Sequence, residues 1–85
     1  MVPGAPIDPE VARRIARALV SELLLARREQ RDDALRQGRL LSRLGPDIMN
    51  TWDHYRERVG EQLAGETRFF QDAVNDILAD GETIL

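Results

Sequence analysis

The chain has 85 residues, a formal net charge of −3 and no cysteine. A chain of this length forms one domain at most, and the lack of cysteine excludes disulfides, thiolate metal sites and cysteine nucleophiles. Small secreted domains usually depend on disulfides, so we expect a cytoplasmic location. No apolar run approaches the roughly 18 residues that cross a membrane. The negative charge also disfavours a general nucleic-acid binder.

The first seven residues are rich in Pro and Gly and are typical of a linker-like lead-in. Asp8-Pro9-Glu10 is a strong helix start, because Asp caps the helix and Pro fits its first position. We expect the first helix to run from about Pro9 to Arg28. Its apolar residues cover about twice the arc that one core contact needs. The pattern therefore predicts a helix covered from two sides, one of them by a partner.

The middle of the chain contains a charged segment and then a second long helix. Asp32 to Gln37 is expected to form a short helical turn that ends at Gly38. A new helix begins near Arg39 and carries an apolar stripe of Leu40, Leu41, Leu44, Ile48, Trp52, Tyr55 and Val59. Gly45-Pro46 interrupts this helix. Because the stripe stays in phase beyond Pro46, a kink is favoured over a break.

The last predicted helix begins at about Gln62 or Glu66 and ends at Asp80, with Gly81 as its C-terminal signal. Its buried face consists of Phe69, Phe70, Ala73, Val74, Ile77 and Leu78. No stretch has the alternation of a strand. The sequence therefore predicts an all-α domain at residues 8–81, a small bundle of three to four helices, kinked or broken near Gly45-Pro46. Residues 82–85 form a C-terminal tail.

No motif in the chain predicts catalysis. His54, Glu57 and Glu61 recur at helical spacing, but one such cluster lacks the ligands of a metal-binding bundle. Asp72, Asp76 and Asp80 share a helix face, whereas calcium sites gather their oxygens from loops. The chain has no phosphate-binding Gly loop and no Ser-His-Asp set. We expect no metal site, no cofactor and no enzymatic activity.

The distribution of charge and apolar residues favours protein–protein interaction. Residues 10–31 hold six Arg and three Glu, whereas residues 46–85 hold three Arg and nine acidic residues. These halves can attract each other within one chain or between two. We expect an interaction or oligomerisation module, such as a homodimer or a complex with another protein, with interface candidates Leu19, Val20, Leu23, Leu24 and Trp52.

One alternative function remains open from the residues alone. It is a nucleic-acid or anionic-ligand adaptor, which would use the basic patch of Arg13, Arg14, Arg17 and Arg28.

The four aromatic residues are Trp52, Tyr55, Phe69 and Phe70. Aromatic residues are enriched at interface hot spots, but their helical spacing here favours a place in the core.

Five stretches of the chain carry a resemblance to a known kind of domain: residues 12–22, 33–38, 55–59, 69–74 and 77–79. Together they resemble a helical C-terminal domain of uncharacterised bacterial proteins, often placed behind a zinc-ribbon module. The resemblance covers about residues 8 to 81. It implies a module of a larger regulatory or scaffolding protein, and it brings no activity and no catalytic residue.

Overall fold

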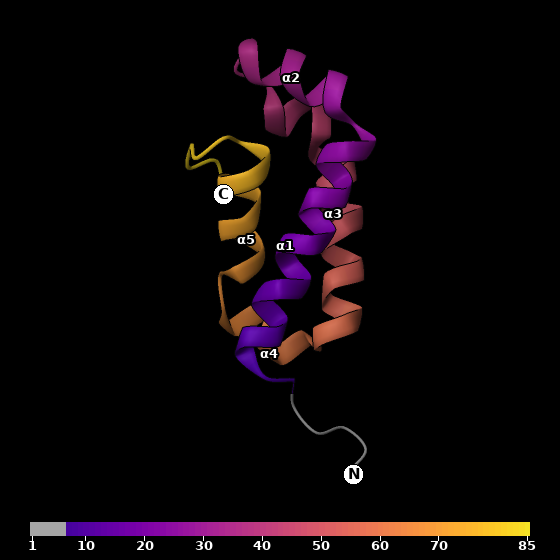
Figure 1. The fold of residues 1–85 in the computed structure, drawn as a ribbon, viewed down its shortest axis with the longest axis vertical. Coiled ribbons are helices and arrows are strands. Elements are labelled where there is room, and N and C mark those ends of the chain that lie inside the picture. Colours follow the sequence, from indigo (N-terminus) through magenta and orange to yellow (C-terminus); the bar gives the residue numbers. More distant parts are fainter. Residues whose placement is uncertain (1–6) are drawn as a thin grey trace.

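The computed structural model of the protein describes residues 7–85, and within this range the chain is helical with no β-strand. The elements are α1 (Pro9–Ala26), α2 (Arg28–Arg36), α3 (Leu40–Val59), α4 (Glu61–Glu66), α5 (Phe69–Ala73) and a π-helical turn, η1 (Val74–Leu78) (Figure 1). The predicted all-α fold is confirmed. The expected linker at residues 1–7 lies, apart from Ile7, outside the described residues.

Helix α1 begins where the sequence predicts. The Asp8 carboxylate accepts a hydrogen bond of 2.8 Å from the Glu10 backbone N–H, and Pro9 occupies the first helical position. The helix ends at Ala26, and α2 starts two residues later, so the expected short turn is a helix of nine residues. Gly38 follows α2 with a φ of +67°, a left-handed conformation that glycine adopts without strain.

Helix α3 continues through Pro46 from Leu40 to Val59. Leu44 and Ile48, on either side of the proline, are both buried. The apolar stripe thus stays on one face across the proline, as the sequence predicts, except that Leu41 is 43% exposed and does not belong to the buried face. Gly60, with a φ of +92°, ends the helix.

The region predicted as one last helix is divided into α4, α5 and η1. Thr67 separates the first two, because its backbone is extended and its hydroxyl donates to the carbonyl oxygen of Leu63 at 2.7 Å. The turn of η1 is wider than that of an α-helix, because the N–H of Ala79 donates to the carbonyl oxygen of Val74, five residues before it, at 3.0 Å. Asp80 and Gly81 both have positive φ and close the segment, as the sequence indicates.

Helix α1 lies between α3 on one side and α5 with η1 on the other, while α2 packs across one end of this bundle (Figure 1). The core joins one face of α1 to the facing residues of α3 and α5. At its centre the rings of Trp52, Tyr55 and Phe70 contact one another, with centroids 5.3 to 5.8 Å apart. Tyr55 and Phe70 are buried and Trp52 is half-buried, so these aromatic residues belong to the core.

Hydrogen bonds from several side chains hold the C-terminal end against this bundle. The Arg31 guanidinium donates to the carbonyl oxygens of Leu78 and Ile77, at 2.8 and 3.2 Å. The side-chain oxygen of Asn75 accepts hydrogen bonds from the backbone N–H groups of Ile84 and Leu85, at 2.8 and 2.9 Å. The tail therefore folds back along η1, and Ile84 packs against the core.

Candidate interaction surface

The structure places most of the predicted interface residues inside the chain's own core. Val20 is fully buried and Leu23 is 9% exposed. Leu19, Leu24 and Trp52 are half-buried and pack against the core. The expectation that a partner covers Val20 and Leu23 therefore needs correction, because later helices of the same chain cover both flanks of α1. For Leu19, Leu24 and Trp52, which remain partly exposed, contact with a partner stays a prediction.

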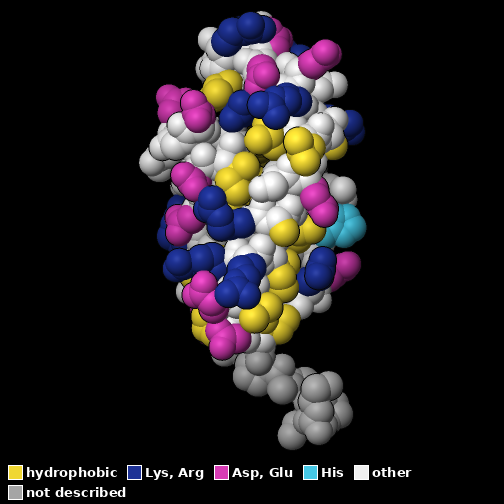
Figure 2. Space-filling view, in the orientation of Figure 1, with side chains coloured by type: hydrophobic (Ala, Val, Ile, Leu, Met, Phe, Trp, Pro, Cys, Tyr) yellow, Lys and Arg dark blue, Asp and Glu magenta, His cyan; other side chains and the backbone are white. Residues whose placement is uncertain are grey.

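The outer face of α1, which points away from the core, still exposes apolar side chains. Val11 is 43% exposed and Leu25 is 70% exposed, and the small side chain of Ala18 is exposed between them. Figure 2 shows apolar side chains running in a broken line along the face that α1 presents. We call Val11, Ala18 and Leu25 the outer stripe. None of the three is among the interface candidates predicted from the sequence.

Helix α3 exposes a second, smaller set of apolar side chains. Leu41 is 43% exposed and Met49 is 60% exposed. Asp53 and Arg56 lie on the same helix just beyond Met49, and they pair with each other at 2.9 Å. These two charges are therefore already paired within the chain.

The predicted basic patch is not a single surface. Arg13 and Arg17 line a shallow groove of about 290 Å³ between α1 and α5, whereas Arg14 is exposed on the outer face of α1 and Arg28 is exposed at the start of α2. The four guanidinium groups therefore do not converge on one ligand.

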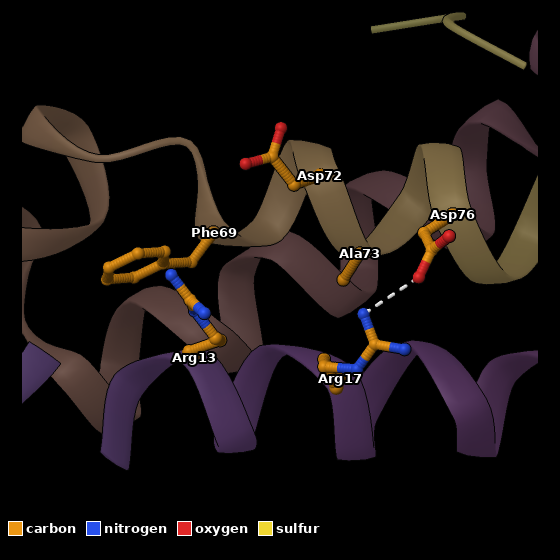
Figure 3. Close-up of a pocket in the computed structure, with 6 residues that line it drawn as sticks. All are labelled: Arg13, Arg17, Phe69, Asp72, Ala73 and Asp76. Atoms are coloured by element: carbon orange, nitrogen blue, oxygen red, sulfur yellow. Dashed lines mark hydrogen bonds and ion pairs between the residues drawn. The ribbon is translucent and has the colours of Figure 1, made fainter. Parts of the chain in front are cut away.

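The groove between α1 and α5 carries balanced charge. Figure 3 shows Arg13 against the ring of Phe69, with the guanidinium carbon 5.3 Å from the ring centroid, and Arg17 pointing at Asp76. The Arg17–Asp76 ion pair is 2.9 Å long, and Asp72 also lines the groove. Two carboxylates thus accompany two guanidinium groups. The groove joins the basic first half of the chain to its acidic second half and has no excess of positive charge.

The surroundings of Tyr55 change the acidity of its phenol. Burial raises the pKa of the Tyr55 phenol above its ordinary value of 10.0, and the nearby Thr67 hydroxyl partly opposes the rise. The phenolic oxygen is buried and forms no hydrogen bond with the described residues, while the Thr67 hydroxyl donates its own proton to the carbonyl oxygen of Leu63. The ring of Tyr55 therefore serves packing.

The described residues contain no cluster of three or more His, Asp or Glu side chains placed to hold a metal ion. His54 lies exposed on α3. Across residues 7–85, no helix is both long and apolar enough to cross a lipid bilayer. Comparison of the chain with protein-family models, curated proteins and solved structures finds no match.

Proposed function

We propose that the chain is a non-catalytic protein–protein interaction module that binds a partner protein on the outer stripe of α1. The observation that carries this proposal is the exposure of Leu25 and Val11 in line along a helix whose opposite face already completes the core. Full burial of a Val or Leu side chain contributes about 1.5 to 3 kcal/mol, and covering the exposed 70% of Leu25 and 43% of Val11 contributes part of that amount. A partner helix or sheet that covered the stripe would gain this free energy without disturbing the fold.

The alternative of an anion-binding adaptor has less support. Its four Arg side chains lie on three different parts of the surface, and two of them share a groove with Asp72 and Asp76. Phosphate binding depends on an excess of positive charge, which this groove lacks. The resemblance described above supports the further proposal that the module works within a larger bacterial regulatory or scaffolding protein in the cytoplasm.

Site-specific photocrosslinking in cells tests the proposal without a known partner. A photoreactive amino acid at position 25 is expected to give adducts heavier than the chain, because a bound protein would lie against it. The matched control places the same amino acid at Asn50, an exposed position of α3. Equal adduct formation at the two positions, or none at either, would contradict a docking surface on α1.

A further inference from the structure

The outer stripe of α1 has a regular spacing. Val11, Ala18 and Leu25 are seven residues apart, and a seven-residue step rotates about 20° from two full helical turns. The three side chains therefore lie almost in a straight line. The line is about 21 Å long at 1.5 Å per residue, with the smallest side chain at its middle.

Two charged residues are placed symmetrically around the middle of the outer stripe. Arg14 lies four residues before Ala18, and Glu22 lies four residues after it. Both side chains are exposed, and neither forms an ion pair with any residue of the described range. Each end of the stripe thus has a large apolar residue, and the inner flanks carry opposite charges.

We infer that the partner of the outer stripe is a second copy of this chain, with its α1 antiparallel to the first and the twofold axis at Ala18. This inference rests on the function proposed above. In such a pair Val11 faces Leu25 of the second copy, and the two Ala18 side chains meet at the axis. Arg14 then lies level with Glu22 of the second copy, within reach of these long side chains across the contact.

In this twofold pair, the outer stripe with Arg14 and Glu22 is complementary to the same surface of the second copy. A twofold interface uses the same patch twice, so a patch with a basic flank at one end and an acidic flank at the other matches itself only when inverted. A parallel pair would instead place Arg14 beside Arg14 and Glu22 beside Glu22, which is unfavourable. The small Ala18 allows the two helices to approach closely. The charges thus select the antiparallel orientation.

The lack of cysteine in the chain makes the orientation directly measurable by disulfide crosslinking. In the antiparallel pair, Ala18→Cys is expected to crosslink with itself under mild oxidation. Val11→Cys and Leu25→Cys are each expected to stay uncrosslinked alone and to form a mixed disulfide when combined. Asn50→Cys on α3 serves as the exposed control. Self-crosslinking of Val11→Cys and of Leu25→Cys would show a parallel pair and overturn the inference.

Charge reversal tests whether Arg14 and Glu22 select the antiparallel orientation. Arg14→Glu and Glu22→Arg are each expected to raise the dissociation constant about three- to tenfold, because each places like charges across two symmetric contacts. The double variant is expected to restore the wild-type value. Glu57→Arg, an exposed reversal on α3, is the control. Failure of the double variant to recover would contradict the pairing of these residues.

The experiments distinguish failure of the second-copy inference from failure of the proposed function. If the purified chain forms no pair at any concentration while photocrosslinking at position 25 captures a different protein, the inference of a second copy is wrong and the proposed function stands. If position 25 captures nothing and no pair forms, the proposed function fails as well. The expected result is a pair of copies that crosslinks at Ala18→Cys in the purified protein.

Discussion

The guanidinium of Arg31 donates a hydrogen bond of 2.8 Å to the carbonyl oxygen of Leu78, 47 residues further along the chain. A second donor of the same group reaches the carbonyl oxygen of Ile77 at 3.2 Å, and a third pairs with Asp32 at 2.8 Å. The Leu78 and Ile77 carbonyls lie at the end of η1, where a helical turn leaves its acceptors unpaired. Arg31 thus joins α2 to the C-terminal end of the bundle.

Replacing Arg31 should destabilise the fold. Hydrogen bonds to a charged group contribute about 1.5 to 3 kcal/mol, so we expect Arg31→Ala to lower the free energy of unfolding by about 2 kcal/mol. Arg31→Lys should recover little, because an ammonium group lacks the planar fork that serves several acceptors at once. Urea denaturation measures both. The control is Arg28→Ala, an exposed position of the same helix, and equal losses at the two positions would contradict this role.

Tyr55 should make stability depend on pH in the alkaline range. Its pKa is raised in the folded protein above the ordinary value of 10.0, so its contribution is fully present below pH 10 and is lost as the pH rises through the folded pKa. The chain has one Tyr and no Cys or Lys, which are the residue types whose ordinary pKa lies near this pH.

The titration of Tyr55 can therefore be followed directly by absorbance. Phenolate absorbance of the folded protein should show a midpoint above pH 10, and the free energy of unfolding should begin to fall above about pH 10. Tyr55→Phe should remove this fall at little cost in stability, because the hydroxyl makes no hydrogen bond with the described residues. A midpoint at or below the ordinary value would show that the ring is not buried as described.

Two leucines of α3 should respond differently to truncation. Leu44 is almost completely buried, so Leu44→Ala should cost about 2 to 5 kcal/mol of unfolding free energy. Leu41 is 43% exposed on the same helix, and Leu41→Ala should cost less than about 1 kcal/mol. Thermal or urea denaturation compares them. Similar losses at both positions would mean that α3 is rotated about its axis relative to this structure.

In the tail, Asn75 binds two backbone amides, whereas Arg68 donates to the Leu85 oxygen at 2.8 Å. Asn75 accepts hydrogen bonds from the N–H groups of Ile84 and Leu85, so Asn75→Ala should remove the hydrogen-exchange protection of these two amides. Asn75→Asp keeps the accepting oxygens and should retain most of it. The amides of α3 serve as internal controls and should exchange at the wild-type rate. Unchanged protection in Asn75→Ala would show that other contacts hold the tail.

The parts of the fold that the sequence predicted correctly depend on local signals. The cap at Asp8 and the positive φ of Gly38 and Gly81 follow from the conformations these residues prefer. The same local reasoning missed the break at Thr67, because that break depends on a hydrogen bond from its hydroxyl to Leu63.

The direction in which α1 faces the core could not be predicted from its own sequence. Apolar residues occupy several sides of this helix, so its pattern fits more than one buried face. The choice is made by the positions of α3 and of α5 with η1, which cover Val20 and Leu23 and leave Leu25 outside. This is a property of tertiary packing, and it moved the candidate interaction surface from the predicted residues to the outer stripe.

The most direct test of the account is the mass of the purified chain in solution, measured by light scattering over a wide range of concentrations. The account predicts a mass that rises with concentration from one chain to two. Leu25→Arg should remain a single chain throughout, whereas Met49→Arg on α3 should pair as the wild type does. A wild type that stays monomeric throughout, or a pair that survives Leu25→Arg and is lost in Met49→Arg, would contradict a second copy on the outer stripe of α1.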